Sequence, residues 1–197
     1  MTDKTKIVDF MKRFSFATII TSKNDFPIAT HLPFVIKEEN DKLFLYSHLA
    51  KQNEQWKHIE EGTALVIFSE PHAYISPTNY EQEVNVPTWN YIAVHAYGKG
   101  QLMTRQEDII NLLESTIDNY EASYKEQWNR LPEKYRLGQM MGIVAFKMEV
   151  TEIQAKEKLS QNKTRNEQQK IIDVLSVSKD TNEQITAEYM QQNLQLK

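Results

Sequence analysis

Residues Ile28 to Lys57 read IATHLPFVIKEENDKLFLYSHLAKQNEQWK, and the chain is organised around this stretch. It opens with an alternating strand, turns at Asn40 and Asp41, and continues as a second apolar strand that ends near Ser47. A polar segment typical of a helix start follows the second strand. The stretch therefore predicts two strands joined by a turn and followed by a helix.

Ser47, His48 and Lys51 gather where the second strand gives way to the expected helix. A helix N-terminus directs backbone N–H groups and a positive dipole end outward, which favours an anion. A hydroxyl, an imidazole and an ammonium would complete a small anion cup. The alternative is purely structural: Ser47 caps the helix and Lys51 is a solvated lysine in its first turn.

The composition is that of an ordinary globular protein, with 197 residues, 40% hydrophobic and 25% charged. The length allows one sizeable core. Because the chain has no cysteine, it has no disulfide, no thiolate metal site and no cysteine nucleophile. The sequence also carries no zinc-ligand spacing, glycine-rich phosphate loop or nucleophile elbow.

The formal net charge is −4, which gives no support to a nucleic-acid-binding surface that would neutralise phosphates. No apolar stretch approaches the length that spans a membrane, and no basic segment followed by an apolar run opens the chain. From these features we expect a cytoplasmic protein that does not associate with a membrane.

Residues 86–103, VPTWNYIAVHAYGKGQLM, form the second informative stretch. Read as a strand, it sends one set of side chains to the core, namely Ile92, Val94 and Ala96. It sends an aromatic and histidine set to the other face, namely Trp89, Tyr91, His95 and Tyr97. That second face is typical of a ligand site or a subunit interface. The alternative is an outer face covered by a local helix.

The remaining apolar patterns predict further elements. The expected strands cover residues 16–21, 28–36, 43–47, 63–68 and 142–150. Three of the expected helices are a first helix around Ile7, Phe10, Met11 and Phe14, a helix that ends near Gly62 and a weak helix from Thr181. Two more begin with capping boxes: Thr104–Glu107, with Ile109, Ile110, Leu113 and Ile117 on one face, and Thr164–Glu167, with Ile171, Ile172 and Leu175 on one face. Because Pro33 lacks an N–H, strand 28–36 is expected at a sheet edge or a bulge.

Strands do not alternate regularly with long helices, so a parallel sheet is disfavoured. The sequence predicts a mainly β protein with helical additions, of the α+β class, built on a small antiparallel barrel. We expect one domain over residues 1–176 and a helical or flexible C-terminal tail over residues 177–197.

Seven ordered segments closely resemble the PaiB-like family, namely FATIIT, PIATHLP, SHLAKQNEQW, PHAYISP, NVPTWNYIAVHAYG, MGIVAFK and KLSQNK. The resemblance runs from about Phe14 to Leu175. Members are described as FMN-binding split-barrel proteins and are often labelled negative transcriptional regulators. The resemblance implies a split β-barrel, an FMN cofactor and a homodimer with FMN in a groove between subunits.

The resemblance also implies which residues bind the cofactor. The isoalloxazine would lie along Ala29 to Pro33, the phosphate would meet Ser47 through Lys51, and Trp89 and Asn90 would cover the flavin from the partner subunit. His95 stands where pyridoxamine-type oxidases carry an arginine. The implied cofactor-binding residues are Ala29, Thr30, His31, Leu32, Pro33, Ser47, His48, Lys51, Asn53, Trp89, Asn90 and His95, and a further ligand-contacting motif would comprise Lys158, Ser160, Asn162 and Lys163.

Two functions follow from the resemblance, and a third stays open. The first is a flavin-binding regulator that acts through flavin state or a protein partner, since the acidic balance and the lack of a recognition helix make direct DNA binding doubtful. The second is an FMN-dependent oxidoreductase of a small molecule, in which His31 or His95 could move a proton. The third is haem binding, with His48 or His72 as candidate ligands.

Overall fold

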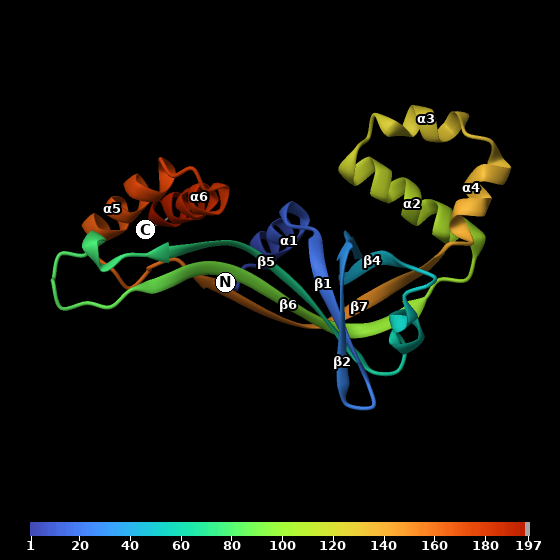
Figure 1. Ribbon diagram of the computed structural model, residues 1–197, viewed down its shortest axis with the longest axis horizontal. Coiled ribbons are helices and arrows are strands. Elements are labelled where there is room, and N and C mark those ends of the chain that lie inside the picture. Colours follow the sequence, from blue (N-terminus) through green and yellow to red (C-terminus); the bar gives the residue numbers. More distant parts are fainter. Residues whose placement is uncertain (196–197) are drawn as a thin grey trace. The chain divides into compact units, whose positions relative to one another are not determined.

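A computed structural model describes residues 1–195 and shows seven β-strands and six α-helices over that range (Figure 1). The strands are β1 (Phe16–Lys23), β2 (Phe26–Pro33), β3 (Val35–Glu39), β4 (Lys42–Ala50), β5 (Thr63–Ile75), β6 (Thr88–Leu102) and β7 (Ile143–Lys158). The helices are α1 (Lys4–Arg13), α2 (Gln106–Tyr120), α3 (Tyr124–Arg130), α4 (Glu133–Met140), α5 (Arg165–Ser176) and α6 (Thr181–Gln195), with short 3-10 helices η1 (Glu54–His58) and η2 (Pro77–Asn79).

The strands form one sheet in the order β2-β1-β5-β6-β7-β4-β3. Strand β1 pairs antiparallel with β2 and β5, and β4 pairs antiparallel with β3 and β7. The protein is therefore of the predicted α+β class. Strand β2 lies at one edge of the sheet and ends at Pro33, as the missing N–H of that residue predicts.

The chain divides into two compact units, and the long strands β5, β6 and β7 contribute residues to both. The large unit comprises Asp3–Phe68 and His95–Gln154, and the small unit comprises Met1–Thr2, Ser69–Val94 and Ala155–Lys197. Helices α1 to α4 belong to the large unit, whereas α5 and α6 belong to the small unit. The division of the sequence at Ser176 into a domain and a tail stays a prediction.

Three phenylalanines from different strands and turns fill the core of the large unit. The ring of Phe34 lies 6.0 Å from that of Phe68 and 6.2 Å from that of Phe146, both edge-on, and all three side chains are fully buried. Each such ring contributes a large apolar area to folding. Next to this core, β6 and β7 approach so closely that a β-carbon at Gly98 would overlap the carbonyl oxygen of Glu149. The glycine is thus required at that position.

Several local predictions are confirmed. Strand β6 buries Ile92, Val94 and Ala96 and leaves the alternate side chains partly exposed. Helix α5 begins with the expected capping box, in which Thr164 and Glu167 bond each other's backbone N–H groups. Helix α6 forms from Thr181, as predicted.

Three local predictions are wrong. The strand expected over residues 28–36 is divided, because the N–H of Phe34 turns to the carbonyl of Ser15 at 2.8 Å. The helix expected to end near Gly62 is only the five-residue η1. The N-cap of α2 is Arg105 rather than Thr104, and it makes no side-chain capping bond.

Candidate functional site

The outer face of β1 and β2 presents a continuous, partly exposed surface in the large unit. The register pairs Thr18 with His31 and Ile20 with Ala29, so that the four side chains share one face. His31 and Ala29 are exposed, and the imidazole of His31 stacks on Phe16 with the ring centres 6.3 Å apart. Phe16 itself is 66% exposed, so the face offers a flat, largely apolar surface to a ligand or a subunit.

The opposite side of β2 is tied to η1 by a polar network. The hydroxyl of Thr30 donates to Oε1 of Gln55 at 2.6 Å, and Nδ2 of Asn53 donates to that hydroxyl at 2.9 Å. Nε2 of Gln55 donates to the carbonyls of Ile19 and Ile28 at 3.3 and 3.0 Å. Gln55 is 1% exposed and joins β1, β2 and η1, although no sequence pattern indicates its burial.

The three side chains of the predicted anion cup do not come together. Ser47 is 2% exposed inside β4 and donates its hydroxyl to the carbonyl of Pro33 at 2.7 Å. His48 projects to the opposite face, where burial lowers the pKa of its imidazole. Lys51 is exposed beyond the end of β4, with its backbone N–H bonded to the carbonyl of Gly142 at 2.8 Å. Lys51 is thus the exposed member of the predicted cup.

The structural alternative, in which Ser47 caps the following helix, is also wrong, because Asn53 caps η1. Its Oδ1 accepts the N–H of Gln55 at 3.1 Å at the start of η1. Leu32 is buried and Pro33 half-buried on β2, so neither offers a free side-chain surface comparable to that of Ala29 or His31.

Trp89, Asn90 and His95 lie on β6 with very different exposures. Trp89 is 53% exposed in the small unit, with its ring 6.0 Å from His72 and 5.8 Å from Tyr74. Asn90 is fully buried, accepts the hydroxyl of Ser160 at 3.1 Å and donates to the sulfur of Met190 at 3.4 Å. Asn90 also lines a cavity of the small unit, and its expected contact with a flavin stays a prediction. His95 is half-buried in the large unit.

The C-terminal motif lines a cavity of about 240 Å³ in the small unit. Lys158 donates to the hydroxyl of Thr88, and Lys163 donates to Oδ1 of Asn85 at 3.0 Å. The ammonium of Lys163 also lies 3.6 Å from the ring centre of Tyr80. The motif residues Lys158, Ser160, Asn162 and Lys163 thus share one cavity, and their contact with a ligand stays a prediction.

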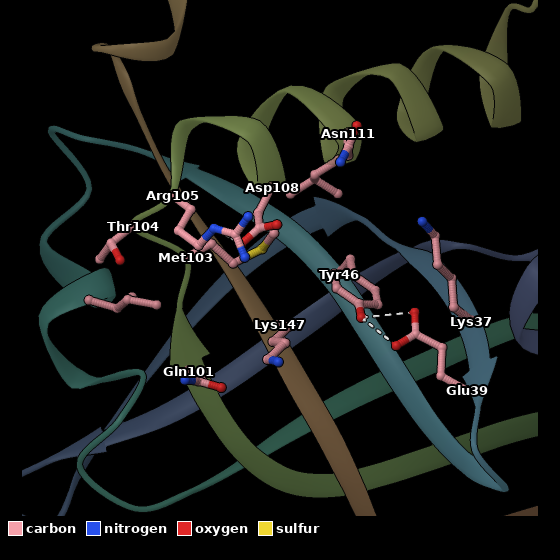
Figure 2. A pocket seen from close by; sticks show the side chains of 12 residues that line it. Lys37, Glu39, Tyr46, Gln101, Met103, Thr104, Arg105, Asp108, Asn111 and Lys147 are labelled. Carbon is pink, nitrogen blue, oxygen red and sulfur yellow. Dashed lines mark hydrogen bonds and ion pairs between the residues drawn. The ribbon is translucent and has the colours of Figure 1, made fainter.

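A second cavity, of about 390 Å³, lies in the large unit between α2 and strands β3, β4 and β7 (Figure 2). Its charged lining includes Lys37, Glu39 and Lys147, none of which the sequence analysis singled out. Lys147 lies far along the chain from Lys37 and Glu39, so only the fold brings it into the same cavity.

Within residues 1–195, no cluster of three histidine, aspartate or glutamate side chains is placed to hold a metal ion. Over the same residues, no helix combines the length and the apolar character needed to cross a membrane.

Comparison with known proteins identifies the family. The family described as "Putative FMN-binding domain" matches residues 1–152 of this chain. The chain belongs to this FMN-binding family. It is 37% identical over 197 residues to "Protease synthase and sporulation protein PAI 2" of Bacillus subtilis, covering 98% of this chain and 94% of the relative. The predicted PaiB-like resemblance is therefore confirmed.

Solved structures confirm the split-barrel fold. The flavocytochrome Anf3 from Azotobacter vinelandii superposes with a TM-score of 0.63 at 16% identity, covering 80% of this chain and 68% of that one. The FAD and heme binding protein from Mycobacterium smegmatis gives a TM-score of 0.60 at 13% identity, covering 80% of this chain and 72% of that one. At these identities the likeness concerns the fold alone.

The predicted flavin cofactor is confirmed by the family, and the residues present fit such a group. An isoalloxazine needs a flat, largely apolar surface, which Phe16, Ile20 and Ala29 supply. Its phosphate needs a cation, which Lys51 supplies. The bond between Asn53 and Thr30 holds the segment after Lys51 against the other side of β2.

Proposed function

We propose that FMN lies along the outer face of β1 and β2, with its phosphate toward Lys51. The hydrogen bond of 2.9 Å from Asn53 to Thr30 supports this assignment, because it attaches the segment that follows Lys51 to the edge strand whose other face presents Ala29 and His31. Ala29 and His31 would contact the ring system, and Lys51 would supply a charge-assisted contact to the phosphate. When bound, FMN supplies hydride or one-electron transfer, and the protein supplies orientation and access.

The protein acts as a homodimer in this proposal. The aromatic side chains of Phe16 and Trp89 are 66% and 53% exposed, and the exposed Tyr74 extends the apolar surface around Trp89, as is typical of an interface. A second copy would cover both side chains and the proposed flavin surface. Trp89 would then contact the cofactor that the partner subunit binds. Such an interface should bury well over roughly 1,000 Å².

The role that we propose is regulatory, with flavin occupancy or redox state governing an interaction with a protein partner. The name of the Bacillus subtilis relative connects that relative with protease synthesis and sporulation, and the two chains align over nearly their full lengths. The net charge of −4 disfavours a mode of action that depends on binding DNA phosphates. Direct sequence-specific DNA binding should therefore be absent or weak.

An FMN-dependent oxidoreductase is the second candidate function, and the exposure of His31 favours it. The imidazole stands on the proposed flavin face, stacked on Phe16 and open to solvent. A neutral or protonated imidazole there could move a proton to or from a substrate. His31 would then be the proton-transferring group.

One preparation tests the cofactor and separates the candidates. Protein purified without added cofactor should be yellow, with flavin absorption bands, and should be dimeric by light scattering at micromolar concentration. A haem Soret band without flavin bands would contradict the FMN assignment. Steady oxidation of NADH or NADPH with simple electron acceptors would favour the oxidoreductase, whereas flavin-dependent capture of one defined partner would favour the regulator. A footprint on promoter DNA at nanomolar protein and physiological salt would overturn the protein-mediated mode of action.

A further inference from the structure

The cavity under α2 lies in the large unit and shares no residue with the proposed flavin surface. Figure 2 shows side chains from the first turns of α2 on one side and from β3, β4 and β7 on the other. Its volume of about 390 Å³ falls in the range of small-molecule pockets, roughly 300 to 1,000 Å³. A bare inorganic ion would leave most of this space to water, since one water takes up about 30 Å³. The cavity therefore suits an organic molecule.

The charges around the cavity are unevenly paired. Three cations and two carboxylates line it, giving a local excess of positive charge in a chain whose net charge is −4. Both carboxylates are engaged: Glu39 accepts the hydroxyl of Tyr46 at 3.0 and 3.2 Å, and Asp108 lies 3.8 Å from Nε of Arg105. The carboxylates are thus already occupied by other partners.

The two lysines have no carboxylate partner among the described residues. Lys37 donates to the hydroxyl of Ser115 at 3.0 Å, and its ammonium lies 5.3 Å from the ring centre of Tyr46. The ammonium of Lys147, the direct cross-strand partner of Tyr46, lies 5.9 Å from the ring centre of Phe44. Both lysines are half-buried, so they have lost part of their hydration without gaining an opposite charge.

We propose that this cavity binds a small hydroxylated organic anion, with Lys37 and Lys147 holding its carboxylate or phosphate group. Each ammonium keeps N–H donors that no carboxylate uses. Gln101 and Asn111 line the same cavity and offer amide groups to the hydroxyls of such a ligand. The proposed flavin surface on β1 and β2 shares no lining residue with this cavity.

Tyr46 is the hydrogen-bond partner of Glu39 in this cavity. Burial and the neighbouring carboxylate of Glu39 raise the pKa of Tyr46 to about 12, so its hydroxyl stays protonated and donates to Glu39. Both carboxylate oxygens of Glu39 lie within hydrogen-bond distance of this hydroxyl, and no ion pair within residues 1–195 joins Glu39 to Lys37. The cavity thereby retains its excess of positive charge.

The test uses the full chain saturated with FMN, so that the phosphate of the cofactor is already in place. Inorganic phosphate, ribose 5-phosphate and citrate are titrated by calorimetry and by thermal unfolding, at an ionic strength held constant with sodium chloride. Lys147→Ala and Lys37→Ala are compared with Lys12→Ala, which removes an exposed lysine of α1. Circular dichroism and FMN affinity report on the folding of each variant.

Ribose 5-phosphate or citrate should bind more tightly than inorganic phosphate, because either one fills more of the cavity. Each of the two lysine variants should weaken that binding about 10-fold or more, while Lys12→Ala and the FMN affinity stay unchanged. Preference for the sugar phosphate or for citrate identifies the anionic group. The proposal is overturned if no organic anion binds beyond the chloride control, or if both lysine variants bind as the wild type does. Failure of FMN binding itself would instead count against the proposed function.

Discussion

The side chains of Asn53 and Thr30 are joined by a hydrogen bond of 2.9 Å between Nδ2 and Oγ1. Asn53 precedes η1, and Thr30 lies in the edge strand β2, 23 residues earlier in the chain. The bond connects the segment that carries Lys51 with the strand that carries Ala29 and His31. The proposed flavin surface depends on this connection.

Replacement of Asn53 by alanine should lower the free energy of unfolding by about 1–2 kcal/mol, because it removes both the cap of η1 and the bond to Thr30. Urea unfolding measures the change, with the exposed Gln52→Ala as the matched control. FMN should also bind more weakly to Asn53→Ala than to the control variant. An Asn53→Ala protein as stable as wild type would show that this bond does not hold the two segments together.

Replacement of Gln55 by leucine should be more damaging. The buried amide serves the carbonyls of Ile19 and Ile28 and the hydroxyl of Thr30, and each buried group left without a partner costs about 1–3 kcal/mol. We expect a loss of at least about 2 kcal/mol in unfolding free energy and faster amide hydrogen exchange in β2. A loss below about 0.5 kcal/mol would mean that leucine packing replaces the network.

The sequence predicted features that depend on local pattern. The alternating burial of β6 follows from a period of two residues, and the Thr164–Glu167 capping box joins residues three positions apart. The family resemblance then supplied the split barrel and the flavin. Both kinds of signal lie within short segments that can be recognised without tertiary structure.

Features that depend on distant partners were missed or misjudged. Ser47 resembled a helix cap, but its buried hydroxyl donates to the carbonyl of Pro33, 14 residues earlier. Gln55 resembled an ordinary polar residue of a helix, yet its side chain is buried and donates to carbonyls of two strands. The burial of Asn90 was likewise not visible in the sequence, because its partners Ser160 and Met190 lie 70 and 100 positions later.

The stability of the apoprotein should fall as the pH drops below neutrality, in part through His48. Burial lowers the pKa of this imidazole in the folded protein, whereas the unfolded chain takes up a proton at its ordinary pKa of about 6.5. The unfolded state thus binds more protons in the window below about 6.5, so the contribution is present above that pH and lost below it. Urea unfolding at pH 7.5 and 5.5 should show a smaller loss for His48→Gln than for wild type. The exposed His72→Gln serves as control, and equal losses in all three proteins would exclude His48.

The proposed dimer should depend on Trp89. Replacing this residue by serine should raise the dissociation constant of the dimer about 30-fold, as expected for a buried aromatic residue at an interface. Tyr135→Ser is a matched control, since Tyr135 is 52% exposed and Trp89 is 53% exposed. Sedimentation velocity over a dilution series measures both. A Trp89→Ser protein that dissociates no more readily than Tyr135→Ser would place the interface elsewhere.

The affinities of FMN and riboflavin for wild type and Lys51→Ala test the flavin assignment most directly. Loss of one charge-assisted contact, worth about 1.5–3 kcal/mol, should weaken FMN roughly 10- to 150-fold. Riboflavin lacks the phosphate and should bind both proteins equally, and the fold should survive because Lys51 is exposed. Equal losses for FMN and riboflavin, or an unchanged FMN affinity, would contradict a phosphate site at Lys51.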